Sequence, residues 1–324
     1  MQKTISIISL DAIENNARII RKVVGERKFF AVVKADAYGH GAERVSQEIE
    51  RIVDGFCVAI VDEGVCLRLS GITKPVLVFC PPLDQGDVER CAFYNLTPTV
   101  NSVNTAKLIK KLPCHLKINS GMNRYGIDPK DLPSVLKTLS AEQIEGVYSH
   151  LYAPQDKKIC AEQLKIFEDA ESFVKVKNKN AVAHLSASAG IFLGENYLKD
   201  GVRCGILLYG YPPQNCTVQG VKPALKVLAR KVQSSRCVGR GAGYFVTDGQ
   251  YKTLSAYRLG YADGFLRNSG LGVGNLCMDA FLSERTDDLI TVFDDAEKTA
   301  NHNKTITYET LCQVTARSEK IYER

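Results

Sequence analysis

The feature that most constrains this chain is a regular alternation of short apolar strands with amphipathic helical segments between Phe29 and Tyr209. Eight strand patterns alternate with seven helical ones, and each helical segment is long enough to return the chain to a parallel neighbour. A doubly wound sheet would alternate in the same way, but eight units over roughly 200 residues favour a (β/α)8 TIM barrel. The predicted strands are Phe29–Lys34, Gly55–Ile60, Pro75–Phe79, Thr97–Val100, Cys114–Asn119, Glu145–His150, Ala181–Ser186 and Arg203–Tyr209.

The pattern changes after Tyr209. Residues Lys222–Cys237 alternate with a period of two, and glycine-rich turns and short strand patterns follow without intervening helices. We therefore predict a TIM barrel domain over residues 1–220 and a mainly-β C-terminal domain over residues 221–324. The first dozen residues could pair with either domain.

Charge and cysteine usage exclude several classes of protein. The net charge is +6, but acidic and basic residues are interleaved, so no polybasic run indicates nucleic acid or a membrane surface as a partner. The 11 cysteines are odd in number, scattered and without a C-x-x-C pair, which is typical of reduced thiols in a cytoplasmic protein. No apolar stretch is long enough to span a membrane. The five histidines show no spacing that suggests a metal site.

Lys34 is the first candidate for chemistry. It ends an apolar strand and is followed by ADAYGHG, and in a barrel such strand ends form the face where active sites are built. Two interpretations remain open on these residues alone. The side chain either extends its charge to water, or it is a lysine that forms a Schiff base with a carbonyl group.

The run AVVKADAYGHG resembles the cofactor-lysine motif of the alanine racemases, which use pyridoxal 5'-phosphate. Further segments resemble that family in the same order: KINSGMNRYGI, EGVYSHLYAP, HLSASAG, VRCGILLYG, GYFVTD, GYADGF and NLCMDA. The matches span roughly residues 1–312. The resemblance implies a fold-type III enzyme with a TIM barrel and a C-terminal β-domain, working as a head-to-tail homodimer with shared active sites.

The resemblance assigns two residues to proton transfer. Lys34 would hold the cofactor and act as one base, while Tyr244 would act as the second base, reaching the opposite face of the substrate from the partner subunit. Racemisation removes the α-proton from one face and returns one to the other, which two flanking bases do directly. Without the family context, Tyr244 reads as an ordinary packed or turn tyrosine.

The resemblance also assigns the contacts to the cofactor. Arg203 would bond the pyridine nitrogen and keep it unprotonated, which discourages transamination, and His150 would support this arginine. The phosphate would lie after the last two barrel strands. Its implied contacts are Tyr38, Ser188 and the backbone at Gly205 and Ile206.

The implied substrate contacts come from both domains. Arg124 would steady the cofactor phenolate and the substrate carboxylate, and Lys117 matches a lysine that is carbamylated in many family members. Met278 would bind the carboxylate through its backbone from the partner subunit, and Tyr261 would lie at the pocket mouth. Taken alone, Lys117 and Arg124 read as a solvated charge pair and Tyr261 as a buried aromatic.

Four departures from the family pattern stand out. Ala316 occupies the position of a tyrosine that contacts the phosphate, and Asn119 replaces the usual aspartate. The stretch 267–277 is several residues shorter than usual, and the segment before GYADG reads SAYRL instead of an apolar strand. The short stretch leaves the substrate range and the placement of Met278 open.

The sequence therefore predicts a racemase that interconverts L- and D-alanine, a small amino-acid substrate, and supplies D-alanine for peptidoglycan. A serine or broad-spectrum amino-acid racemase is the alternative within the same chemistry. A non-catalytic pyridoxal-phosphate carrier of the same barrel fold usually lacks the β-domain. A decarboxylase of the same fold would place a carboxylate where Arg203 stands.

Overall fold

The computed structural model describes residues 4–213, 216 and 218–324, which form two compact units. The barrel unit contains the described residues of Ile13–Ala37 and Ala42–Val221. The C-terminal unit contains residues 4–12, Tyr38–Gly41 and Lys222–Arg324. Three chain segments therefore build the C-terminal unit, and one of them follows Lys34 almost directly.

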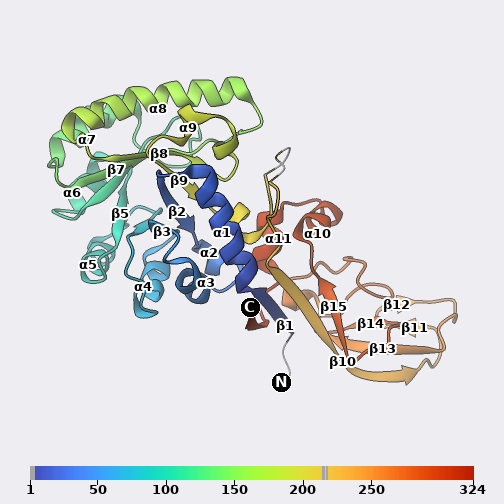
Figure 1. Cartoon of the computed structure of the whole chain (residues 1–324). Coiled ribbons are helices and arrows are strands. Elements are labelled where there is room, and N and C mark those ends of the chain that lie inside the picture. Colours follow the sequence, from blue (N-terminus) through green and yellow to red (C-terminus); the bar gives the residue numbers. More distant parts are fainter. Residues whose placement is uncertain (1–3, 214–215, 217) are drawn as a thin grey trace. The chain divides into compact units, whose positions relative to one another are not determined.

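Eight parallel strands close the barrel in sequence order, which confirms the predicted fold class (Figure 1). They are β2 (Lys28–Val32), β3 (Gly55–Val58), β4 (Val76–Val78), β5 (Thr97–Val100), β6 (Cys114–Lys117), β7 (Ile144–Tyr148), β8 (Val182–Ala187) and β9 (Gly201–Cys204). The eighth predicted strand is wrong in its second half. Residues Ile206–Tyr209 form the 3-10 turn η3, because the chain turns at Gly205 (φ −117°, ψ −86°).

Helices connect the barrel strands, and the longest of them, α8, packs against β7 and β8 (Figure 1). Several begin at side-chain caps: Asp84 accepts from the Asp87 amide, Ser102 from that of Thr105, and Asp156 from those of Lys158 and Ile159. The helices are α1 (Leu10–Val24), α2 (Lys34–Tyr38), α3 (Ala42–Ile49), α4 (Val61–Leu69), α5 (Gln85–Phe93), α6 (Val103–Leu108), α7 (Leu132–Thr138), α8 (Lys157–Lys177) and α9 (Glu195–Leu198), with 3-10 turns η1 (Pro129–Asp131) and η2 (Gly190–Phe192).

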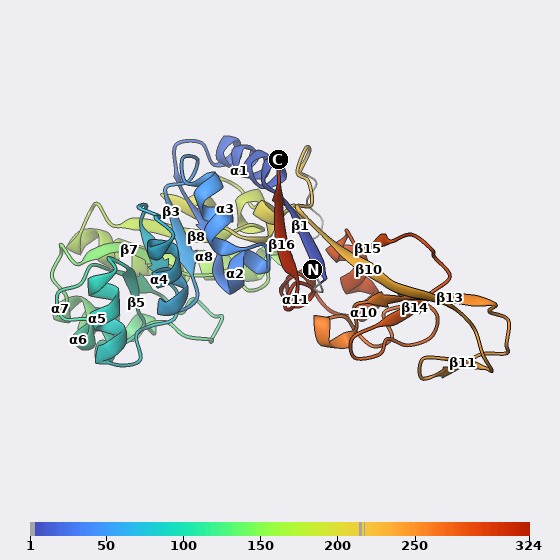
Figure 2. The same ribbon diagram turned by 90° about the horizontal axis from the view of Figure 1, so that it is seen from below.

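The C-terminal unit is built on a sheet in the order β14-β13-β10-β1-β16, with β15 also paired to β10. The first strand of the chain belongs here: β1 pairs antiparallel with β10 and parallel with β16, and the three lie side by side in Figure 2. The strands are β1 (Ile5–Ser9), β10 (Leu225–Arg236), β13 (Thr253–Arg258), β14 (Phe281–Ser283), β15 (Leu289–Phe293) and β16 (Glu319–Glu323), with the hairpin β11 (Gly241–Ala242) and β12 (Phe245–Val246).

Two helices of the C-terminal unit, α10 (Ala296–Asn303) and α11 (Thr307–Gln313), were not anticipated by the sequence analysis. Helix α10 begins where the Asp295 carboxylate accepts hydrogen bonds from the amides of Glu297 and Lys298. The 3-10 turn η4 (Tyr261–Asp263) lies between strands β13 and β14. The unit is mainly β, as predicted.

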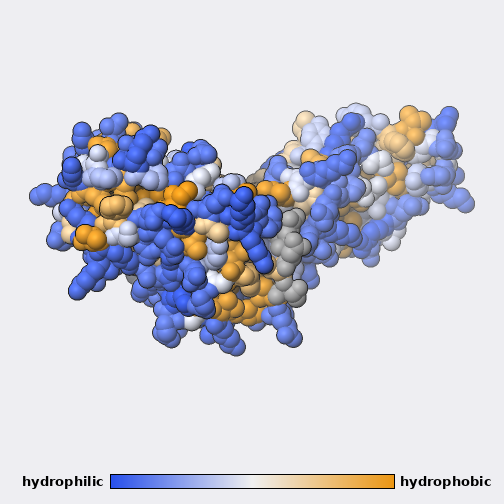
Figure 3. Space-filling model, turned by 90° about the horizontal axis from the view of Figure 1, so that it is seen from above, coloured by the Kyte–Doolittle hydropathy of each residue, from blue (hydrophilic) through white to orange (hydrophobic). Residues whose placement is uncertain are grey.

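The surface mixes hydrophilic residues with scattered hydrophobic ones, and both appear on the face drawn in Figure 3. Over the described ranges, no helix is long and apolar enough to cross a membrane. Within the same ranges, no group of three or more histidine, cysteine or acidic side chains is arranged to hold a metal ion.

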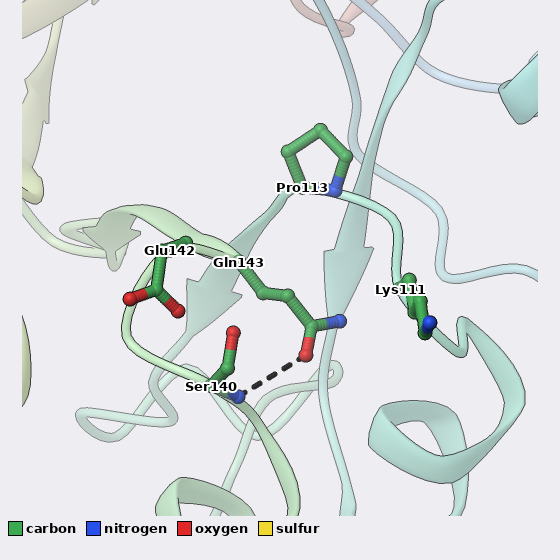
Figure 4. Close-up of a pocket in the computed structure, with 5 residues that line it drawn as sticks. All are labelled: Lys111, Pro113, Ser140, Glu142 and Gln143. Carbon is green, nitrogen blue, oxygen red and sulfur yellow. Dashed lines mark hydrogen bonds between the residues drawn. The ribbon is translucent and has the colours of Figure 1, made fainter.

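A shallow pocket lies at the amino ends of β6 and β7 (Figure 4). It has a volume of about 360 Å³ and is lined by Lys111, Pro113, Ser140, Glu142 and Gln143. The Gln143 side chain accepts a hydrogen bond from the Ser140 amide, 3.1 Å away, and so closes the loop before β7. This pocket lies at the opposite ends of the strands from Lys34.

Candidate active site

The barrel residues predicted for the site stand at the carboxyl ends of their strands. Lys34 follows β2, Lys117 ends β6, His150 follows β7 and Ser188 follows β8. Arg203 lies in β9, one residue before its end. Because the strands are parallel and closed, these ends lie on the same face of the barrel.

The backbone after Lys34 makes a left-handed turn. Ala35, Asp36, Ala37 and Tyr38 all have φ between 52° and 55°, which costs on the order of 1–2 kcal/mol for each residue that has a Cβ. Neighbouring carboxylates hold the strained turn. Glu63 accepts from the amide of Ala35 at 2.7 Å, and Asp36 accepts from that of Ala42 at 2.7 Å. The chain on either side of Lys34 is thereby fixed by β2 and by this turn.

Arg203 is buried and its guanidinium is held by four acceptors. Nη1 donates to the carbonyl oxygen and to Nδ1 of His184, at 2.6 and 2.8 Å. Nη2 donates to the carbonyl oxygens of Ser149 and Leu185, at 2.5 and 3.1 Å. Burial lowers the pKa of Arg203, but an arginine remains charged at any physiological pH. The barrel therefore holds a fixed cation.

A second histidine extends this network. Nε2 of His184 lies 2.8 Å from Nδ1 of His115. Arg203 can only donate, so a neutral His184 accepts at Nδ1, carries its proton on Nε2 and donates to His115. Burial lowers the pKa of His115 to about 3, and burial together with the charge of Arg203 also lowers that of His184. Both rings are consequently neutral at pH 7.

Tyr148 joins the buried groups together. Its ring stacks on His184 with the centroids 5.0 Å apart, and its hydroxyl lies 2.8 Å from Oγ1 of Thr99. Nζ of Lys117 lies 4.8 Å and the Arg203 guanidinium 5.1 Å from the centre of the same ring. The Tyr148 ring thus lies within about 5 Å of both basic side chains.

Lys117 is buried, and its environment disfavours its charge. Burial lowers the pKa of Lys117 well below the ordinary value, and the positive charges of Arg203 and Arg124 add to this. Arg124 is exposed, and its guanidinium lies 5.1 Å from the centre of the Tyr125 ring. The solvated charge pair considered for Lys117 and Arg124 does not describe Lys117, which is buried.

His150 is also surrounded by cations. Burial lowers its pKa well below the ordinary value, and the charges that act on it in the same direction are those of Arg203, Lys117, Arg124 and Lys34. These four side chains therefore lie close enough to His150 to act on it electrostatically. The imidazole bonded directly to Arg203, however, is that of His184 and not that of His150.

Ser188 stands beside the chain turn after β9. Its hydroxyl oxygen accepts from the amides of Gly205 at 3.2 Å and Leu207 at 3.4 Å. A hydroxyl and converging amides at this point of a barrel are the usual donors to a phosphate group. Ile206 lies between the two amides and begins the 3-10 turn η3.

The remaining predicted residues belong to the C-terminal unit. Tyr244 lies with Gly243 (φ 60°) at the tip of the β11–β12 hairpin and is 79% exposed. A Cβ on Gly243 would lie 3.2 Å from Sγ of Cys277, the residue before Met278. The amide of Tyr261 donates to the Cys277 carbonyl, at 3.1 Å. Tyr244, Tyr261 and Met278 thus lie on neighbouring segments, and Tyr261 is 41% exposed instead of buried.

Tyr38 is buried in the C-terminal unit, where its ring lies 5.9 Å from that of Tyr308. The next residue explains the close packing here. Gly39 has φ 83°, and a Cβ on it would lie 2.3 Å from the Thr315 hydroxyl. This turn therefore requires glycine.

Three residues of the site were missed by the sequence analysis: His115, His184 and Tyr148. All lie in barrel strands and point a polar group into a buried network. The available signal was a polar ring in the middle of a strand that otherwise reads as core, such as His184 in AVAHLS. Together, the fold and this network define an α/β-barrel protein whose site lies at the carboxyl ends of the strands.

Comparison with known proteins gives the family. The alanine racemase N-terminal domain matches residues 8–213 of this chain. The alanine racemase of Streptococcus agalactiae is 31% identical, over 98% of this chain and 98% of that protein. The solved alanine racemase from E. faecalis is 25% identical with a TM-score of 0.89, over 99% of this chain and 98% of that one. The alanine racemase from Bartonella henselae, solved with covalently bound pyridoxal phosphate, is 25% identical with a TM-score of 0.84, over 99% of each chain.

The chain belongs to the alanine racemase family. Its donor set fits the cofactor named for the Bartonella henselae protein. A lysine at a strand end can bond a carbonyl carbon, and a buried arginine can donate to a ring nitrogen. The Ser188 hydroxyl, which accepts from two backbone amides, can donate its own proton to a phosphate.

Proposed function

We propose that this protein interconverts L- and D-alanine, using pyridoxal 5'-phosphate held on Lys34. One observation favours racemisation over decarboxylation. The only charged side chain in β9 is Arg203, a buried and permanently charged cation whose guanidinium donates to four acceptors in the barrel. An arginine can donate a hydrogen bond to the pyridine nitrogen, but it does not transfer its proton, so the nitrogen stays unprotonated. A decarboxylase of this fold, by contrast, would require a carboxylate at that position.

When bound, the cofactor supplies an electron-withdrawing ring that acidifies the α-hydrogen of an attached amino acid. The chain's own bases then move the proton. The Lys34 amine takes or returns it on one face, and the Tyr244 phenol does so on the other. Tyr244 is proposed to come from a second copy of the chain, since its side chain is 79% exposed at a hairpin tip.

The remaining contacts follow from the donors available. Ser188, the amides at Gly205 and Ile206, and the Tyr38 hydroxyl are proposed to bind the phosphate. Arg203 binds the ring nitrogen, and His184, its hydrogen-bonded neighbour, orients it. His150 is proposed to support Arg203 from its position among the cations of the site.

The substrate carboxylate requires positive charge and free amides. Arg124 and the backbone at Met278 of the second copy are proposed to bind it, with Tyr261 at the pocket mouth. Lys117 is proposed to be carbamylated. Its pKa is lowered well below the ordinary value, so its neutral amine can add to carbon dioxide with loss of one proton. The anion formed would compensate the nearby charges of Arg124 and Arg203.

A homodimer with shared active sites is part of the proposal. The residues assigned to the partner's site are exposed in the single chain: Tyr244 by 79%, Met278 by 54% and Tyr261 by 41%. Pairing would cover these side chains and complete each site. We further propose that the enzyme works in the cytoplasm and supplies D-alanine for peptidoglycan; its 11 cysteines are all free thiols, which suits a reducing compartment.

A serine or broader amino-acid racemase is the second candidate. The stretch 267–277, which is several residues shorter than usual in the family and is expected near the pocket entrance, supports this alternative. A non-catalytic carrier remains the third, and it would bind cofactor on Lys34 without using Tyr244.

Chiral chromatography of the products from L- and D-alanine tests the proposal. The wild-type protein with added pyridoxal phosphate should give the same racemic mixture from either enantiomer. A protein that binds the cofactor on Lys34 but forms no opposite enantiomer from alanine or serine would instead be a carrier.

A further inference from the structure

The C-terminal unit contains a closed ring of four charged residues, formed by Arg258, Asp263, Asp279 and Arg317. Arg258 donates from Nη1 to Oδ2 of Asp263, at 3.2 Å, and to the carbonyl oxygen of Asp279, at 3.3 Å. Arg317 completes the ring. Its Nη1 donates to Oδ1 of Asp279 at 2.9 Å, and its Nε lies 3.7 Å from Oδ1 of Asp263.

Asp263 is the buried centre of this ring, with a side chain only 3% exposed. It ends the turn η4 and also accepts from the amide of Gly260, at 2.8 Å. A buried carboxylate requires compensating charge, and both arginines supply it from different chain segments. Removing Arg258 would leave the Asp263 carboxylate with the Gly260 amide and, as its remaining positive partner in the ring, the longer contact to Arg317.

The ring joins the two segments that carry the proposed substrate contacts. The amide of Ala262 donates to the Met278 carbonyl at 3.0 Å. A Cβ on Gly260 would lie only 2.2 Å from that carbonyl oxygen, so the two segments are in direct backbone contact. Asp279, which receives bonds from both arginines, directly follows Met278.

Arg258 is the member of the ring that the family resemblance does not explain, because it lies in SAYRL, one of the departures noted in the sequence. We propose that Arg258 is a positioning residue that fixes the Met278 backbone against Tyr261 and thereby sets substrate binding. This inference rests on the proposed function, in which those two residues contact the substrate.

Two readouts test the proposal. The chain has three methionines, Met1, Met122 and Met278, so a 13C-methyl-methionine NMR spectrum contains few signals, and Met278→Leu assigns the relevant one. In Arg258→Gln we expect the Met278 methyl resonance to shift, and KM for alanine to rise at least about fivefold with kcat within about twofold. Arg258→Lys should restore both readouts in part, because lysine keeps the positive charge but lacks the planar guanidinium group that bonds two acceptors at once.

The control is Arg285→Gln, which removes an arginine of the same unit that pairs with Asp287 on the surface. It should change neither readout. If Arg258→Gln does not fold, Arg258→Leu, which keeps the packing of the aliphatic stem, is measured in the same way.

An unchanged Met278 resonance in the folded variant would overturn the positioning role. So would a fall in kcat and thermal stability at unchanged KM, which indicates a purely structural residue. A wild-type protein without racemase activity would refute the proposed function instead, while the Met278 resonance would still decide whether Arg258 positions this segment.

Discussion

The buried His115–His184 pair predicts a specific loss of stability in acid. Burial lowers the pKa of His115 to about 3, whereas an unfolded histidine titrates near 6.5. Because the native pKa is the lower one, the unfolded chain binds more protons as the pH falls. The contribution of the neutral His115 to the free energy of unfolding is therefore fully present above pH 6.5 and declines progressively as the pH approaches 3.

The size of this effect follows from the pKa difference. Between pH 7 and pH 4.5 the unfolded histidine becomes almost fully protonated while the native ring stays neutral, which corresponds to about 2–3 kcal/mol. In His115→Asn, an amide oxygen can still accept from Nε2 of His184 but no group at position 115 titrates. Between pH 7 and pH 4.5 the free energy of unfolding of the variant should therefore fall by about 2–3 kcal/mol less than that of the wild type.

Urea unfolding followed by circular dichroism at pH 7 and pH 4.5 measures the difference. Carboxylates titrate in both proteins, so their contribution cancels when the two pH-dependent losses are subtracted. His302→Asn is the matched control, because His302 is exposed and its removal should leave the loss at the wild-type value. Equal losses in His115→Asn and the wild type would refute the assignment of a buried neutral His115.

Three further predictions concern the proposed site. Lys34→Ala should lose the covalent link to pyridoxal phosphate, seen as absence of a borohydride-reducible band near about 420 nm; a retained band would remove Lys34 from its role. Tyr244→Phe should keep the cofactor and lose α-proton exchange with one alanine enantiomer by about 10²-fold or more, and equal exchange with both at the wild-type rate would exclude Tyr244 as a base. Lys117→Gln should weaken alanine binding about tenfold, and 13C-bicarbonate should give the wild type but not this variant a carbamate NMR signal; a wild type without the signal would contradict the carbamylation.

The main features of the barrel could be predicted because its signals are local. The predicted strands are apolar runs of four to seven residues, and Lys34 is conspicuous as a charge at the end of one of them. Arg203 begins the predicted strand Arg203–Tyr209 and was assigned through the family resemblance instead. The 3-10 turn at Ile206–Tyr209 could not be separated from a strand, because ILLY is as apolar as the strand before it.

The hydrogen-bonded network around Arg203 could not be predicted in the same way. In a parallel barrel strand both faces are buried, so the alternation that marks inward side chains is lost and His115 and His184 read as core residues. The left-handed turn after Lys34 gives no signal at all, since Ala35, Asp36 and Ala37 carry no strong preference for positive φ. It depends on Glu63, 28 residues away from Ala35.

The most direct test of the account is α-deuterium exchange in D₂O with purified protein and pyridoxal phosphate, using L-alanine, L-serine and L-lysine in parallel with chiral analysis of the products. We expect exchange of L-alanine together with the appearance of deuterated D-alanine, at a rate that exceeds that of the other two substrates. Exchange that leaves every amino acid in the L-form, or no exchange despite a cofactor reducible onto Lys34, would contradict racemisation by two bases.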